Sequence, residues 1–130
     1  MKEKLHFLPD GSLGDLLIVI DMQNVYQEGQ PWGCRDTSGV WQRIRKLIDE
    51  EIVDNVIFTQ YLPPKEPVGT WKIYNEENRE INEDTWMSEL IEEVKPYAGQ
   101  YPLFSKDKYS SYTNDEVRKL AGKAKRVLLA

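Results

Sequence analysis

The strongest hydrophobic signal in the chain is a run of five consecutive aliphatic residues, LLIVI, at positions 16–20. A strand that is apolar at every position is typical of the centre of a parallel sheet, where both faces are covered. Further apolar runs at 56–59, 101–105 and 127–130 predict three more strands. The third of these is expected to be short, because Pro102 has no N–H to donate to a ladder.

Between the first two strands, apolar residues recur at helical spacing. This pattern predicts a helix over 37–52, with Thr37 or Ser38 as its N-cap. A second apolar stripe at 86–94 predicts a helix that ends at Pro96, since proline does not continue a helix.

A third helix is predicted to begin at a capping box formed by Thr113 and Glu116. Strands and helices therefore alternate, which predicts an α/β fold: a doubly wound, mostly parallel sheet with helices on both faces, in one domain over 1–130. The last apolar run reaches Ala130 without a turn or polar tail. We therefore expect the domain to be incomplete at its C-terminal end, cut within the fourth strand.

The segment 60–84 contains three prolines and shows no clear periodicity, so we predict a long irregular connection. Long connections inside compact domains are usually functional or disordered. Two aromatic residues within it, Trp71 and Tyr74, favour an ordered flap that lines a site.

Composition excludes several classes of protein. The net charge is −5 with both signs interspersed, so no basic face is available for nucleic acid. No apolar run is long enough to span a membrane. The chain has one cysteine, Cys34, and one histidine, His6, so we expect a reducing cytoplasm and no metal site. We interpret Cys34 as an incidental loop residue.

Two polar residues follow predicted strands: Asp21 after the first and Lys106 after the third. The carboxyl ends of parallel strands share one edge of the sheet, where ligands bind in open α/β folds. A lysine there would keep the aspartate ionised or stabilise a developing negative charge. The alternative is that Asp21 only ends its strand.

Three motifs in order resemble the isochorismatase-like cysteine hydrolase family, which also includes nicotinamidases. They are DMQN at 21–24, FTQ at 58–60 and KDKYSSY at 106–112, and the resemblance spans about residues 16–130. It implies a doubly wound α/β domain that hydrolyses small amide-like substrates through an aspartate, a lysine and a cysteine. It also implies a homo-oligomer.

Within this resemblance, Asp21 corresponds to the family's general base and Lys106 to its lysine, with Lys108 as a competing choice. The family's cysteine follows the fourth strand, so the nucleophile is expected beyond Ala130. Two alternatives stay open. One is isochorismatase-type hydrolysis of a vinyl ether with Asp21 as an acid, and the other is an inactive fragment or binding module.

The resemblance also bears on cofactors and substrate contacts. Nicotinamidases of this family carry an Asp-x-His metal pair after the second strand, whereas this chain has QYLPP at 60–64. We therefore predict no metal and no cofactor, and a substrate other than nicotinamide. The residues predicted to contact the substrate are Gln23, Tyr61, Trp71 and Tyr112. The alternative for the flap aromatics is that they close the core beneath the flap.

Overall fold

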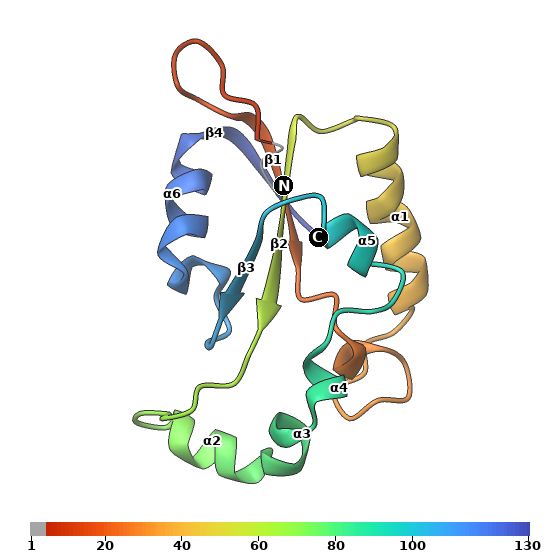
Figure 1. Cartoon of the computed structure of the whole chain (residues 1–130), viewed down its shortest axis with the longest axis vertical. Helices are drawn as coiled ribbons and strands as arrows, with labels where there is room; N and C mark the ends of the chain where they lie inside the picture. Colours follow the sequence, from red (N-terminus) through yellow and green to blue (C-terminus); the bar gives the residue numbers. More distant parts are fainter. Residues whose placement is uncertain (1–4) are drawn as a thin grey trace.

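The computed structural model describes residues 5–130, so only residues 1–4 of the predicted domain lie outside the described residues. Its strands form a four-stranded, all-parallel sheet in the order β3-β2-β1-β4 (Figure 1). The elements are β1 (Gly14–Ile20), η1 (Asn24–Tyr26), α1 (Thr37–Asp49), β2 (Asn55–Tyr61), α2 (Trp71–Glu77), α3 (Arg79–Glu83), α4 (Thr85–Ser88), α5 (Lys95–Ala98), β3 (Leu103–Lys106), η2 (Ser111–Thr113), α6 (Asp115–Lys123) and β4 (Ala124–Leu129). The predicted α/β fold and its four strands are confirmed.

Strand β1 lies inside the sheet because its aliphatic run can be buried on both faces. The residues from Leu16 to Val19 are fully buried. β1 pairs with β2 on one side and with β4 on the other, so that Ile18 is opposite both Ile57 and Leu129. This is the arrangement that an uninterrupted apolar strand favours.

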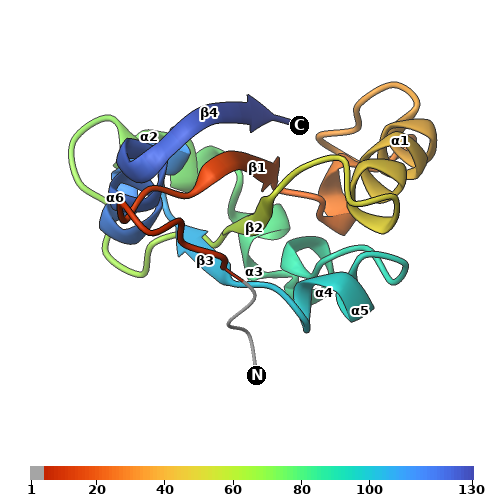
Figure 2. The ribbon, with the colours of Figure 1, turned by 90° about the horizontal axis from the view of Figure 1, so that it is seen from above.

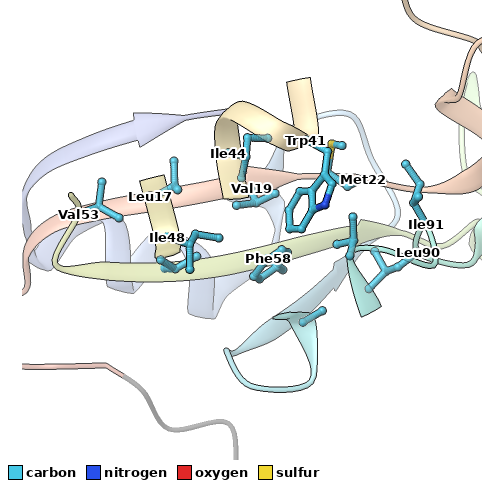
Figure 3. Close-up of a cluster of buried hydrophobic side chains, with 13 residues drawn as sticks. Leu17, Val19, Met22, Trp41, Ile44, Ile48, Val53, Phe58, Leu90 and Ile91 are labelled. Atoms are coloured by element: carbon cyan, nitrogen blue, oxygen red, sulfur yellow. The ribbon is translucent and has the colours of Figure 1, made fainter. Parts of the chain in front are cut away.

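Alternate residues of β1 supply two separate cores. Leu17 and Val19 pack with Phe58 and with Trp41 of α1 (Figure 3). On the other face, Leu16, Ile18 and Ile57 pack with Val117 of α6. Seen from above, α1 and α5 lie on one side of the sheet and α6 on the other, which gives three layers (Figure 2). In the described part of the chain, no helix combines the length and apolarity needed to cross a membrane.

The predicted bounds of the first helix are partly wrong. The N-cap is Asp36, whose carboxylate accepts a hydrogen bond from the Gly39 N–H, rather than Thr37 or Ser38. The Thr37 hydroxyl donates instead to the Tyr26 carbonyl, 2.8 Å away. The helix ends at Asp49, and Ile52 beyond it is exposed.

The single helix predicted over 86–94 is wrong. The structure has α4, then an extended residue, Leu90, which forms an antiparallel bridge with Gln23, and then α5. The bridge holds Leu90 outside helical conformation, so the apolar stripe is divided between α4, an extended residue and the turn that precedes α5. Pro96 lies in the first turn of α5, where its missing N–H costs no helical hydrogen bond.

The connection predicted to be irregular contains two short helices, α2 and α3. They lie across the carboxyl ends of β2 and β3, beneath the sheet in Figure 1. We call residues 62–84, including these two helices, the flap. The predicted lack of regular structure in this segment is wrong for both helices.

The capping box predicted at Thr113 is also wrong. Asn114 caps α6, because its side-chain oxygen accepts from the N–H groups of Glu116 and Val117. The N-terminal end of α6 therefore lies one residue later than predicted.

Asn114→Ala is expected to lower the free energy of unfolding by about 1 kcal/mol, because the first turn of α6 loses its cap. Urea denaturation measures the loss. Thr113→Ala is the matched control and should cost less, since its hydroxyl donates only to the Ser110 carbonyl in an exposed turn. An equal or larger loss for Thr113→Ala would contradict this assignment of the cap.

Candidate active site

Asp21 and Lys106 meet at the carboxyl edge of the sheet. The Lys106 Nζ lies 2.9 Å from Oδ2 of Asp21, and the two side chains are only 2% and 13% exposed. Asp21 follows β1 and Lys106 ends β3, with β2 between them. The two residues are therefore brought together by the sheet although they are far apart in sequence.

The backbone of Asp21 turns sharply as the chain leaves β1. Asp21 has φ of 51°, and its N–H donates to the Thr59 carbonyl on β2. The Thr59 hydroxyl donates in turn to Oδ1 of Asp21 at 2.7 Å. One carboxylate oxygen thus accepts from Thr59 and the other faces Lys106, so the carboxylate is held in one orientation.

Lys106 is held from a second direction. Its Nζ donates to the carbonyl of Tyr109 at 2.5 Å, and its own carbonyl accepts from the Leu62 N–H. The competing lysine, Lys108, is 28% exposed and pairs with Asp107 at 3.2 Å. The structure therefore brings Lys106, and not Lys108, to Asp21.

Gln23 is buried between the sheet and the flap. Its amide nitrogen donates to the carbonyls of Tyr61 and Ser88, each at 2.8 Å, and its oxygen accepts from the Tyr61 N–H. Because these contacts are with backbone, the geometry gives Gln23 a role in holding the end of β2 against α4.

Tyr61, at the end of β2, is 6% exposed, and its hydroxyl is buried without a hydrogen-bond partner among the described residues. Its ring lies edge-on to Trp32, with the ring centres 6.3 Å apart. Burial, followed by the charge of Asp107, raises the pKa of Tyr61. A buried hydroxyl without a partner costs free energy unless water or a ligand satisfies it.

Trp71, Tyr74 and Tyr109 form a group that we call the aromatic trio. Each pair of rings is in edge contact, with centres between 4.9 and 5.9 Å apart. Trp71 and Tyr74 belong to α2, whereas Tyr109 follows β3. The predicted substrate residue Tyr112 is exposed in η2 and lies outside the trio.

Two hollows border the acid–lysine pair. One, of about 310 Å³, is mainly apolar and is lined in part by Asp21, Tyr26, Cys34 and Ala130. The other, of about 510 Å³, includes Lys106 in its lining. Over residues 5–130, no group of three or more histidine, cysteine or acidic side chains is arranged to hold a metal ion.

Comparison with known proteins agrees with the motifs and with the fold. Residues 15–130 match the family model described as the isochorismatase domain. The chain belongs to the isochorismatase family.

Solved structures of other proteins share this fold. An isochorismatase-like hydrolase from Alkaliphilus metalliredigens has a TM-score of 0.58 at 21% identity, over 90% of this chain and 64% of that chain. The N-carbamoylsarcosine amidase from Thermoplasma acidophilum has a TM-score of 0.63 at 24% identity, over 89% and 66%. The pyrazinamidase of Pyrococcus horikoshii in complex with zinc has a TM-score of 0.55 at 19% identity, over 89% and 69%.

This isochorismatase domain therefore spans about two thirds of the length of those structures. At these identities, the likeness shows the fold. The search of curated proteins found no match.

Two residues of this isochorismatase domain that contact the acid–lysine pair were not predicted as site residues. Thr59 lies in the FTQ motif and Tyr109 in the KDKYSSY motif, so both were within quoted motifs. Their roles depend on a hydroxyl and a carbonyl that face the pair. Neither motif alone indicates which of its atoms does so.

In this isochorismatase domain, the pKa of Tyr74 is expected to lie well above that of an ordinary tyrosine. Burial, followed by its hydrogen bond with Tyr109, raises the pKa of Tyr74 from 10.0 to about 12. Because the folded pKa is raised, the stabilisation is complete below pH 10 and is lost as the pH rises towards 12. The unfolding temperature should fall over this window, and phenolate absorbance of the folded protein should show the late titration.

Tyr74→Phe is the control for this pH dependence. It should remove one tyrosine's share of the late phenolate titration, since burial also raises the pKa of Tyr26 and Tyr61. It should also reduce the fall in unfolding temperature between pH 10 and 12. A phenolate signal that is complete near pH 10 in the folded protein would contradict the assignment.

Proposed function

We propose that this isochorismatase domain is part of a hydrolase that acts on a small amide-like substrate. Asp21 serves as the general base, Lys106 as the neighbouring cation, and a cysteine that follows Ala130 in a longer polypeptide as the nucleophile. The observation that carries the proposal is the buried contact of 2.9 Å between Asp21 and Lys106 at the carboxyl edge of the sheet. A buried acid–amine pair in such a position is typical of an active site that transfers protons.

The position of β4 supports the proposed source of the thiol. The Ala130 carbonyl accepts from the Ile20 N–H at 2.7 Å, directly before Asp21, and Ala130 lines the same hollow as Asp21. A residue joined to Ala130 would therefore emerge beside the carboxylate.

The proposed chemistry uses these residues in turn. Asp21 removes the thiol proton, and Lys106 stabilises the negative charge that results. The thiolate adds to the substrate carbonyl, and the amine leaves with a proton from the Asp21 carboxylic acid. Water then attacks the thioester and gives one proton to Asp21. The thiolate leaves and takes this proton back from Asp21, which releases the carboxylic acid and restores the thiol and the carboxylate.

An amide-like substrate is supported by two neighbours, which are an N-carbamoylsarcosine amidase and a pyrazinamidase. The second was solved with zinc. The described residues do not fit a zinc site of this kind, because the chain has one histidine, His6, and no clustered donors. No step of the proposed mechanism uses a metal.

Substrate contacts are part of the same proposal. The predicted contact from Tyr61 stays a prediction; its hydroxyl is buried and lacks a partner among the described residues. Contacts from Gln23, Trp71 and Tyr112 stay predictions. A homo-oligomer is proposed from the family resemblance, and a cytoplasmic location from the single cysteine.

The test is a turnover screen of small amides, ureas and vinyl ethers. It compares the 130-residue chain with the longer product of the same reading frame, each with and without thiol alkylation. We expect amide hydrolysis by the longer product only, and its loss on alkylation. Cys34→Ser in the longer product should retain the activity, because serine is close to cysteine in size at this place in the hollow and the proposed nucleophile is another cysteine.

Three outcomes would overturn the proposal. Turnover that Cys34→Ser abolishes would make Cys34 the nucleophile. Turnover of a vinyl ether that resists alkylation would favour Asp21 as an acid. A longer product that turns over none of these substrates would favour a binding module.

A further inference from the structure

Lys106 is held against Asp21 by a loop that has little support of its own. The loop carbonyl that accepts from Lys106 Nζ belongs to Tyr109, which lies between β3 and η2 and is 70% exposed. The Lys106 side chain, by contrast, is 2% exposed. A buried ammonium group therefore depends on the position of an exposed backbone segment.

The support for this segment comes from the flap. The Tyr109 ring is 4.9 Å from the ring centre of Trp71 and 5.9 Å from that of Tyr74, both in edge-to-face geometry. On the same loop, Lys108 lies over the Trp71 ring, 5.2 Å from its centre. Two residues of the loop thus contact α2.

Tyr74 and the C-terminal end of α2 also contact the loop that follows Asp21. Trp32 lies 6.3 Å from Tyr74 between ring centres, and its indole N–H donates to Asn78 at the end of α2. Helix α2 therefore contacts two loops. One follows β1 and begins at Asp21, and the other follows Lys106, the last residue of β3.

We propose that Trp71 and Tyr74 are positioning residues, which act through Tyr109 to hold Lys106 against Asp21. Neither ring touches the acid–lysine pair directly. Trp71 and Tyr74 fix the Tyr109 ring, and the Tyr109 carbonyl fixes the ammonium group. The proposal rests on the role of Lys106 in the proposed function, but its test requires no turnover.

The test measures how fast Lys106 reacts with a small acylating reagent, by peptide mapping and mass spectrometry of the folded chain. Tyr109→Ala keeps the carbonyl and removes the ring, and Trp71→Ala removes its partner. Each is expected to raise the Lys106 labelling rate about tenfold, since an aromatic contact of ordinary strength is lost. Lys72, an exposed residue of α2, is the internal standard.

Conservative variants distinguish the loss of a specific ring contact from a general destabilisation of the fold. Tyr109→Phe and Trp71→Phe keep a ring in place and should leave the Lys106 rate within about twofold of the unchanged chain. Ile73→Ala changes an exposed side chain of the same helix and should also leave it unchanged. Circular dichroism of each variant identifies any that fails to fold, in which case Tyr74→Ala replaces it.

Two results would overturn the proposal. One is a labelling rate of Lys106 that stays, in both alanine variants, within about twofold of the rate in the unchanged chain. The other is an equal rise in Ile73→Ala or in the phenylalanine variants. Absence of turnover in the amide screen would count against the proposed function and leave this result unaffected.

Discussion

Replacing Lys106 with methionine is expected to lower the free energy of unfolding by about 3–5 kcal/mol. Methionine keeps most of the apolar stem but removes the ammonium group that faces Asp21 at 2.9 Å. The carboxylate, which is 13% exposed, then keeps the Thr59 hydroxyl but loses its cation. Urea denaturation at neutral pH measures the loss, since a buried charge without its partner weakens the folded state alone.

Lys108→Met is the matched control for this prediction. Lys108 pairs with Asp107 near solvent, so its loss should cost about 1 kcal/mol or less. The double variant Asp21→Asn with Lys106→Met should recover part of the loss, because no buried charge is left unpaired. A loss below about 1 kcal/mol for Lys106→Met would show that the pair behaves as an ordinary surface ion pair.

Asp21→Asn is expected to lower kcat for amide hydrolysis by about 10²–10⁴-fold in the longer polypeptide of the proposed function. Asparagine has nearly the same shape and can accept from the Thr59 hydroxyl, but it cannot take the thiol proton. The site should therefore keep its structure and lose its base. Steady-state kinetics on the best amide of the screen measures the effect.

Asp15→Asn provides the control at the other end of β1. Asp15 pairs with Arg126 of β4 at 2.6 Å, far from the carboxyl edge of the sheet. Its kcat should stay within about twofold of the unchanged protein, as for most surface substitutions. If Asp21→Asn kept more than about a tenth of the activity, Asp21 would not be the general base.

The sheet and the acid–lysine pair could be predicted because each depends on a short, strong pattern. The run at 16–20 has no polar residue, which is typical of a strand inside a parallel sheet. The parallel order then brings the residues that follow two strands to one edge. Asp21 and Lys106 were therefore predicted to meet from their positions after two parallel strands alone. The structure places their side chains in contact.

The connection from β2 to β3 could not be predicted in the same way. Its apolar stripe at 86–94 is compatible with one helix, and the decisive contact is the bridge between Leu90 and Gln23, which are far apart in sequence. Helices α2 and α3 are short and have no buried residues of their own, so they leave no periodic apolar signal. Helix α6 is capped by Asn114 and not by Thr113. The sequence does not distinguish the two, because neighbouring polar residues can each cap a helix and the backbone turn decides which one does.

The positive φ of Asp21 restricts which amino acids position 21 accepts. Of the twenty residues, glycine, asparagine and aspartate enter the left-handed region with the least strain. A saturation library at this position would therefore mix two effects, since bulky or branched replacements would distort the chain as well as remove the carboxylate. Among the three tolerated residues only aspartate can exchange a proton, so the shape of the main chain narrows the choice of side chain before any reaction takes place.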